Sequence, residues 1–389
     1  MKLIEVNSKK LNNSFHKVPF IIYKSDKNWI PNLKQDIDKL FNPKTNKLYD
    51  IGAEAIRWVL VDENDNLIGR VATFINPKTV DSGKMRIGGM GFFECINNQE
   101  SANLLFNACV KWLKERGVEG MDGSVNFGER NEFWGLLIDN FKSPPSYQVN
   151  YNPPYYKSLF EHYGFKTYFN QILFARKLKY ELSSFYERAY KKLASDSAYK
   201  FETIEGKSLV NVAEDFRQVY NGAWATHKDV KEMKSEVAQK IMQKLKPIID
   251  PEIIAFVYYD NKPIAFFVGI PELNELFKYV NGNLNWIGKL KFVFNKWKNP
   301  PKTMVGIVFG VVKEFQGKGV DAALIRWFSS NVIEKLQYEN TILTWIGDFN
   351  PKMLKIANLV GGKEYRKLRT YRYLFDKDAV FEKHPIVNV

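Results

Sequence analysis

Val311-Val-Lys-Glu-Phe-Gln-Gly-Lys-Gly-Val-Asp-Ala-Ala-Leu-Ile325 contains a strand end, a glycine loop and a helix start in direct succession. The apolar run Met304–Val312 predicts a buried strand, and apolar residues from Ala322 to Ile333 recur at helical spacing. Glycines let a backbone approach a phosphate closely, and the unpaired N–H groups of a helix's first turn point toward it. The segment therefore predicts an anion site, with a plain strand-to-helix turn as the alternative.

This segment resembles motif A of the GNAT acyltransferase superfamily, a Gln/Arg-x-x-Gly-x-Gly/Ala loop that holds the pyrophosphate of acyl-CoA. Gln316 and the loop Gly317-Lys318-Gly319 match that motif in place. Asp321 stands where the family has Gly or Ala, and its carboxylate would repel a pyrophosphate bound to the same N–H groups unless Lys318 or solvent compensates. The resemblance implies acyl-CoA or acetyl-CoA as co-substrate, in contact with Val311, Val312, Gln316, Gly317, Lys318, Gly319, Val320, Asp321 and Asn350.

The segment that follows resembles motif B of the same superfamily, in which a strand and an Asn lead into a helix that ends at Gly. Here the Asn is Asn350 and the helix pattern ends at Gly361-Gly362. A Tyr four residues before the motif B glycine is a common general acid in the family, but this chain has Asn358 there and Phe160 in its first half. Three donor hypotheses therefore stay open: acyl-CoA, an acyl carrier or aminoacyl-tRNA, and no donor.

The chain as a whole resembles a group of bacterial tandem-GNAT proteins. The phrases that carry this resemblance are Tyr23 to Pro31, Asn152 to Tyr156 and Pro271 to Asn274. It implies an α/β (α+β) fold with two GNAT-like domains in tandem, each a mixed, mostly antiparallel twisted sheet flanked by helices.

An internal repeat supports two domains independently of the resemblance. Identical residues recur 198 positions apart in five places: Asp62 and Asp260, Asn152 and Asn350, Pro153 and Pro351, Lys157 and Lys355, and Gly164 and Gly362. A single spacing held over about 100 residues indicates duplication better than a coincidence of common turn residues. We expect domains at 1–180 and 181–389, because the segment from Arg176 to Lys200 is charged and has few core residues.

Each half predicts the same order of elements, with a hairpin at Ala55–Ile75 in the first half and at Ile253–Ile270 in the second. In the first half we expect a central strand at Met85–Ile96 and a helix at Glu100–Arg116. The connection between them, Ile96–Ser101, has no glycine. The first half should therefore hold no CoA in the usual way, and it either shapes the acceptor pocket or serves as a scaffold.

Catalytic side chains are harder to predict than the donor loop. Glu94 ends the first central strand, where GNAT relatives can keep a general base; a solvated or salt-bridged carboxylate is the alternative. Asn350 is the second catalytic candidate, since it also stands in motif B. Arg130 could bind an anion, with an ordinary loop arginine as the alternative. His227 could line a cleft, with a histidine at a helix end as the alternative.

Charge and cysteine content restrict the partners and the compartment. The formal net charge is +14, which favours anionic partners such as CoA, an acyl carrier, RNA or an anionic membrane surface, or reflects a lysine-rich surface. The two cysteines, Cys95 and Cys109, allow no disulfide framework, and no metal-ligand spacing is present, so we expect no metal. With no signal-peptide pattern and no long apolar run, we expect a cytoplasmic protein.

An insertion from Pro271 to Lys302 separates the second hairpin from its central strand. Ile287, Leu290, Phe294 and Trp297 fall on one helical face, with lysines around it. Such a helix either contacts an anionic membrane or a carrier protein, or packs over its own domain.

The leading functional hypothesis is N-acyl transfer from acyl-CoA to an amine. The alternatives are a transferase that uses aminoacyl-tRNA or an acyl carrier, and a non-catalytic binding or scaffold protein with a GNAT fold.

Overall fold

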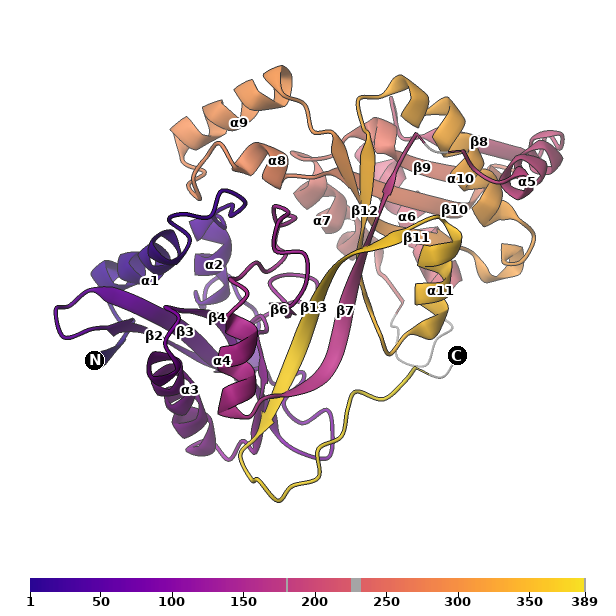
Figure 1. Cartoon of the computed structure of the whole chain (residues 1–389). Helices are drawn as coiled ribbons and strands as arrows, with labels where there is room; N and C mark the ends of the chain where they lie inside the picture. The colour runs from indigo at the N-terminus through magenta and orange to yellow at the C-terminus, as the bar shows by residue number, and fades with distance from the viewer. Residues whose placement is uncertain (180, 225–231, 388–389) are drawn as a thin grey trace. The chain divides into compact units, whose positions relative to one another are not determined.

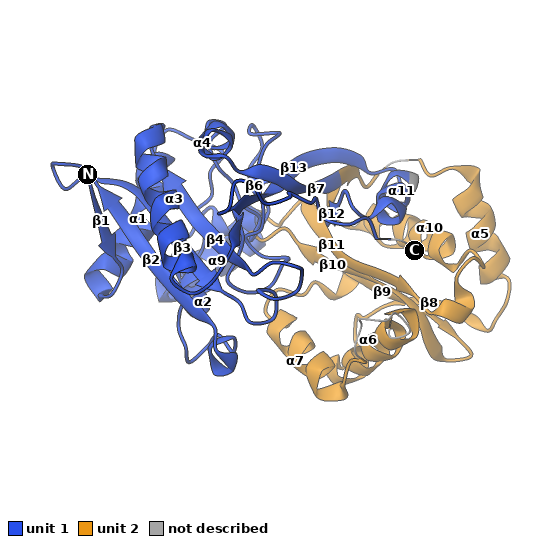
Figure 2. Ribbon diagram, turned by 90° about the horizontal axis from the view of Figure 1, so that it is seen from below, with its two compact units in different colours: residues 1–174, 274–298, 345–389 blue, residues 175–273, 299–344 orange. Residues whose placement is uncertain are grey.

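The computed structural model describes residues 1–179, 181–224 and 232–387 (Figure 1). The chain forms two compact units (Figure 2). Unit 1 comprises Met1–Phe174, Asn274–Lys298 and Trp345–Val389, and unit 2 comprises Ala175–Leu273 and Asn299–Thr344. His227 lies outside the described residues.

Unit 1 is a sheet with helices on both faces. Its elements are β1 (Lys2–Glu5), α1 (Lys9–Ile22), α2 (Lys34–Leu40), β2 (Glu54–Val61), β3 (Leu67–Ile75), β4 (Ile87–Cys95), α3 (Gln99–Lys114), β5 (Gly120–Gly123), β6 (Leu136–Leu137), α4 (Tyr156–Tyr163), most of β7 (Lys166–Lys177), α8 (Asn274–Phe277), α9 (Trp286–Lys298), α11 (Pro351–Leu359) and β13 (Lys363–Leu374). The strand order is β1-β2-β3-β4-β5-β13-β7, with β6 beside β13.

The two faces of this sheet follow from the alternation of side chains along each strand. Leu60 and Val71 point to one face and join a core with residues of α3 and α4. Val59 and Ala72, one position away, point to the other face and pack with Phe15 of α1 and residues of α2. The same strands thus serve two helical layers.

Unit 2 repeats this arrangement with strands of its own. Its elements are α5 (Ser184–Ala194), β8 (Tyr199–Thr203), α6 (Leu209–Trp224), α7 (Ser235–Leu245), β9 (Ile254–Tyr259), β10 (Lys262–Pro271), β11 (Thr303–Val311), α10 (Val320–Asn331) and most of β12 (Asn340–Gly347). The strand order is β12-β11-β10-β9-β8. Phe256 and Phe266 pack with α6 and α7 on one face, and Ala255 and Ala265 pack with α10 on the other.

The predicted α/β class and the predicted elements are confirmed, including the hairpins, the helix α3, and the amphipathic helix, which is α9. A simple division of the chain at residue 180 would place the last strand, β13, with the second half, but the structure places it in unit 1. β13 pairs antiparallel with β5, Tyr371 opposite Gly123 and Leu374 opposite Gly120. Residues 345–389 therefore belong to unit 1.

In the described part of each unit, two strands pair in parallel over four residues and then separate. In unit 1, β4 and β5 pair from Ile87 opposite Gly120 to Met90 opposite Gly123. In unit 2, β11 and β12 pair over Thr303–Gly306. Beyond these residues, the far ends of β4 and β11 have no parallel neighbour among the described residues, so their outward backbone groups need other partners or a ligand.

Candidate active site

The end of β4 is closed by two tyrosines. Cys95 lies opposite Gly69 of β3, and the N–H of Ile96 donates to the carbonyl of Ile68. In an antiparallel ladder this pattern directs the backbone groups of Cys95 away from β3. The hydroxyl of Tyr156 accepts from the Cys95 N–H at 2.8 Å, and the hydroxyl of Tyr155 donates to the Cys95 carbonyl at 2.8 Å. No backbone group of Cys95 is left for a ligand.

The end of β11 has the same backbone pattern and a different environment. Val311 lies opposite Ala265 of β10, and the N–H of Val312 donates to the carbonyl of Ile264. The backbone groups of Val311 therefore point away from β10, as those of Cys95 point away from β3. Its carbonyl accepts from the Gln316 side chain at 3.0 Å. Within the described part of the chain, the N–H of Val311 has no hydrogen-bond partner.

The helices that follow these strands begin differently. Asn98 caps α3, with its side chain accepting from the N–H of Ser101 at 2.7 Å. Helix α10 begins at Gly319, which has a left-handed φ of +83° and offers no side-chain cap. Gly317 also has a left-handed φ, +72°, so both predicted glycines are needed for backbone reasons. The first turn of α10 is therefore available to an anion, and that of α3 is not.

The other residues predicted at the donor loop lie around this turn. Lys318 is exposed, with its ammonium 5.1 Å from the centre of the Phe315 ring. Val320 is buried, and Asp321 is exposed in the first turn of α10. Asn350 belongs to unit 1, where its side chain caps α11 by accepting from the N–H of Met353 at 3.2 Å.

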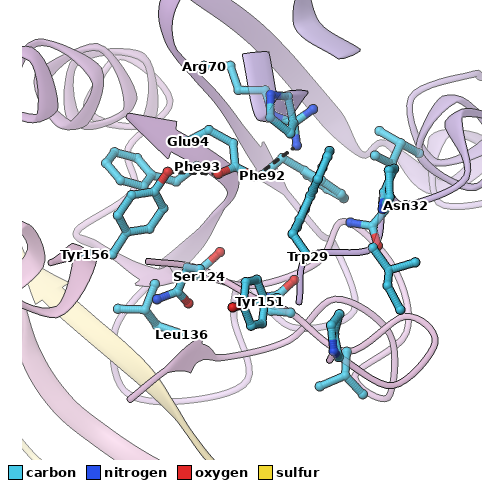
Figure 3. A pocket seen from close by; sticks show the side chains of 18 of the residues that line it. Trp29, Asn32, Arg70, Phe92, Phe93, Glu94, Ser124, Leu136, Tyr151 and Tyr156 are labelled. Carbon is cyan, nitrogen blue, oxygen red and sulfur yellow. Dashed lines mark hydrogen bonds and ion pairs between the residues drawn. The ribbon is translucent and has the colours of Figure 1, made fainter. Parts of the chain in front are cut away.

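Glu94, the predicted general base, lies in a buried polar cluster (Figure 3). Its Oε2 accepts from the hydroxyls of Tyr23 and Tyr156, each at 2.8 Å, and its Oε1 lies 3.4 Å from Nη2 of Arg70. Burial raises the pKa of Glu94, and the Arg70 charge and the hydrogen bonds only partly oppose this. Because protein groups occupy both carboxylate oxygens, the geometry gives Glu94 the role of a structural anion more readily than that of a base.

Arg70 reaches this cluster because of a proline in α1. Pro19 lies inside the helix and has no N–H, so the carbonyl of Phe15 loses its helical partner. Nη1 of Arg70 donates to this carbonyl at 2.9 Å. The guanidinium also lies 4.6 Å from the centre of the Phe15 ring. A single sequence feature, a proline on the buried face of a helix, thus positions the counter-ion of Glu94.

The cluster forms one wall of a cavity of about 50 Å³. Two of the phrases that suggested the tandem-GNAT resemblance meet here. Tyr23 and Trp29, from the first phrase, stack with ring centroids 4.8 Å apart, and Asn152 and Tyr156 come from the second. Asn152 accepts from the N–H of Leu137 and donates to its carbonyl, so its amide is fully engaged.

His16 also lines this cavity and was not predicted. Its Nε2 lies 2.7 Å from Oδ1 of Asp38, which also accepts from the Asn12 side chain at 3.1 Å. Burial lowers the pKa of His16 more than Asp38 raises it, so the neutral imidazole is favoured at neutral pH. A carboxylate only accepts hydrogen bonds, so the neutral ring carries its proton on Nε2 and a lone pair on Nδ1.

A second, more open cavity of about 530 Å³ adjoins the first. Both are lined by His16, Phe20 and Lys34. The remaining walls of the larger cavity come from α1 and from residues 280–291, including Ile287 and Lys291. The N–H of Lys34, at the start of α2, donates a hydrogen bond to the carbonyl of Gly282 and so links α2 to residues 280–291. His16 therefore lies where a small polar cavity meets a larger one.

The sequence contained weak signs of these missed residues. Arg70 interrupts an otherwise apolar strand, and His16 falls on the buried face of an amphipathic helix. Neither sign identifies a partner.

Other candidates have structural roles or none in this site. The guanidinium of Arg130 lies within 6 Å of three aromatic rings, those of Trp134, Phe169 and Phe349. Burial, together with the nearby Glu94 carboxylate, raises the pKa of Cys95 to about 12, so its thiol is not a nucleophile at neutral pH.

The described residues contain no cluster of three or more His, Cys, Asp or Glu side chains arranged for a metal. Among those same residues, no helix combines the length and apolar character of a transmembrane span.

Comparison with known sequences gives two relatives that match along nearly the whole chain. A bacterial ceramide synthase from Caulobacter vibrioides is 25% identical over 92% of this chain and 93% of its own length. Protein YghO of Escherichia coli is 24% identical over 92% of this chain and 91% of its own. No protein-family profile matches the chain.

Comparison with solved structures identifies the fold. A tandem GNAT protein from the clavulanic acid biosynthesis pathway superposes with a TM-score of 0.54 at 7% identity, covering 97% of this chain and 99% of that protein. A glucosamine N-acetyltransferase region of a fungal multi-domain β-N-acetylglucosaminidase gives a TM-score of 0.56 at 13% identity, covering 96% of this chain and 38% of that longer protein. The predicted tandem GNAT-like fold is therefore confirmed.

Proposed function

We propose that this protein is an N-acyltransferase that moves a fatty-acyl group from acyl-CoA to the amino group of a long-chain lipid amine. The observation that carries the proposal is the difference in hydrogen bonding between the ends of β4 and β11. The N–H of Val311 at the end of β11 has no hydrogen-bond partner in the described ranges and lies next to an uncapped helix start, whereas the end of β4 is closed by tyrosines. An acyl thioester with a pyrophosphate is the type of ligand that such a strand end and glycine turn suit.

The acceptor class is supported by the relative named a bacterial ceramide synthase, which matches over 92% of this chain. Ceramide is a long-chain amino alcohol whose nitrogen carries a fatty-acyl group. The larger cavity of unit 1, at about 530 Å³, is of a size that suits a lipid chain segment, and it opens beside Phe20, Val280 and Ile287. We therefore assign donor recognition to unit 2 and acceptor recognition to unit 1.

His16 is the base in this proposal. Within unit 1, the ammonium form of a lipid amine bound in the larger cavity first loses one proton to Nδ1 of His16, which has a lone pair because Asp38 holds the ring proton on Nε2. The neutral amine nitrogen attacks the thioester carbonyl carbon, a C–N bond forms, the C–S bond breaks, and one proton of the amine passes to the leaving thiolate, which becomes the CoA thiol. Lys17, Lys34 and Lys291 line the larger cavity, and their charge favours an amine that is neutral and hence nucleophilic.

The direct test supplies the full-length protein with palmitoyl-CoA and sphinganine dispersed in detergent micelles. We expect release of one CoA thiol for each N-palmitoyl product detected by mass spectrometry. If a short polar amine such as spermidine is acylated and sphinganine is not, the lipid acceptor is wrong. If titration calorimetry detects no binding of CoA or palmitoyl-CoA and no thiol is released, the donor assignment is wrong.

The role of His16 has a separate test. His16→Gln keeps a donor for Asp38 but removes the titrating nitrogen, so we expect kcat to fall by about 10²–10⁴-fold with palmitoyl-CoA affinity unchanged. In the unaltered protein kcat/KM should decrease on acidification, with a midpoint below 6.5, because burial lowers the pKa of His16 and protonation removes the base. The His16→Gln variant should not show this decrease of kcat/KM at low pH. If the variant kept both the kcat and the pH dependence of the unaltered protein, His16 would be excluded as the base.

A further inference from the structure

Helix α9 exposes a large apolar face to solvent. The exposed fractions of Trp286, Leu290 and Trp297 are 70%, 62% and 81%. Successive helical residues are turned by about 100°, so these three fall on one stripe about 120° wide. The full stripe consists of Trp286, Ile287, Leu290, Val293, Phe294 and Trp297. Side chains of this size are rarely left in water as a group without a binding role.

The opposite face of α9 fixes the helix to unit 1. Gly288 is buried, and a methyl group in place of its hydrogen would lie 2.1 Å from the carbonyl oxygen of Asn283. The ring of Phe292 lies 5.5 Å from that of Phe277 in the neighbouring helix α8 (Figure 1). The helix is therefore held with its apolar stripe pointing outward.

Lysines border the stripe on both sides. On the helical projection, Lys289 and Lys296 fall along one edge and Lys291 and Lys298 along the other. The helix contains no acidic residue. An apolar face rich in tryptophan with cationic flanks matches the interface of an anionic bilayer, where aromatic rings occupy the headgroup level and lysines reach lipid phosphates. A protein partner would need a matching acidic border, whereas anionic lipids supply that charge on every side.

We propose that α9 lies in the plane of an anionic phospholipid bilayer, with its apolar stripe inserted at the headgroup–acyl boundary. Ile287, Gly288 and Lys291 of this helix also line the cavity of about 530 Å³. A lipid amine could then pass from the membrane into that cavity without crossing water. This second step rests on the proposed function, whereas the membrane contact does not.

The contact is tested by flotation of the full-length protein with vesicles of phosphatidylcholine alone and of phosphatidylcholine with 30% phosphatidylglycerol. We expect partition onto the anionic vesicles, and about a five-fold loss for each of Lys289 and Lys296 changed to Glu. The triple variant Trp286→Ser/Leu290→Ser/Trp297→Ser should lose at least about ten-fold in partition. These side chains are exposed, so the variant should keep the circular dichroism spectrum and melting temperature of the unaltered protein.

A matched control removes exposed apolar side chains elsewhere. Phe185, Val210 and Val237 of helices α5, α6 and α7 have exposed fractions of 56%, 62% and 46%, and their joint change to Ser should leave partition unchanged. Absence of binding to anionic vesicles, or equal binding by the α9 triple variant, would overturn the proposal. A dimer that depends on the stripe, with no vesicle binding, would overturn it as well and assign the face to a second copy of the chain.

Activity assays separate this inference from the proposed function. With sphinganine in detergent micelles, the α9 triple variant should be as active as the unaltered protein. With sphinganine embedded in anionic vesicles, it should lose at least about ten-fold in rate, in line with its partition. No activity in micelles for either protein would count against the function and leave the vesicle-binding result to stand by itself.

Discussion

The ends of β4 and β11 show how one backbone pattern can lead to two different chemical surfaces. Cys95 and Val311 occupy the same place in their sheets, with backbone groups directed away from the neighbouring antiparallel strand. At Cys95 both groups are bonded to tyrosine hydroxyls. At Val311 the carbonyl accepts from a side chain of the adjoining loop, and the N–H has no partner among the residues that the structure describes. A duplicated fold therefore does not imply a duplicated site.

The repeat spacing explains part of this difference. The tyrosines that close β4 are Tyr155 and Tyr156, and the residues 198 positions later are Met353 and Leu354. Neither has a hydroxyl, so the second half lacks the groups that satisfy the strand end in the first. The second half has instead the glycine loop, whose two left-handed residues allow an uncapped helix start. A few side chains thus decide that the strand end at Cys95 is closed and the strand end at Val311 is open.

The largest effect should come from breaking the charged cluster behind β4. Glu94→Gln leaves the Arg70 guanidinium buried without its counter-ion, so we expect a loss of about 3–5 kcal/mol in the free energy of unfolding, measured with urea. Glu314→Gln, an exposed carboxylate beside the open loop, should change stability by less than about 0.5 kcal/mol. Equal effects would mean that the cluster is not what holds the closed end together.

Opening the closed end should cost less. Tyr156→Phe removes one donor to Glu94 and leaves the buried N–H of Cys95 without a partner, which should destabilise by about 1–3 kcal/mol. We expect no second CoA site to appear in titration calorimetry, because Asn98 still caps α3. A second site with this variant would show that Tyr156 alone closes the first half.

Straining the open loop should affect binding as well as folding. Gly317 and Gly206 have nearly equal left-handed φ values, +72° and +74°, and at both positions an added Cβ atom would have no neighbour within 4 Å. Changing either to Ala should destabilise by about 1 kcal/mol. Only Gly317→Ala should weaken CoA binding, by about five-fold or more. Equal CoA affinity in both variants would remove the loop from the donor site.

The smallest effect should come from the charge inside the open loop. Asp321→Asn keeps the size of the side chain and removes a carboxylate that opposes a pyrophosphate at the start of α10. Helix-end charges contribute about 0.3–1 kcal/mol, so CoA affinity should rise about two- to five-fold at low salt and less at high salt. Weaker binding in this variant would mean that Asp321 helps to hold the loop in its open form.

The sequence was sufficient for the features that depend on neighbouring residues. Apolar spacing predicted the helices and hairpins of both halves, including α9 with its lysine borders. The glycine loop predicted the uncapped start of α10, because a left-handed turn requires residues without a Cβ atom. The absence of glycine after β4 likewise predicted that the first half would lack such a turn.

Only the tertiary structure decided which distant residues meet. Glu94 bonds to Tyr23 and Tyr156, which are 71 and 62 positions away, and His16 bonds to Asp38 across two helices. It also decided that β13, at the end of the chain, completes the sheet of unit 1. Periodicity and turn residues describe what one segment does by itself. A buried hydrogen-bonded cluster or a strand pairing depends on the packing of several segments, and no single segment carries that information.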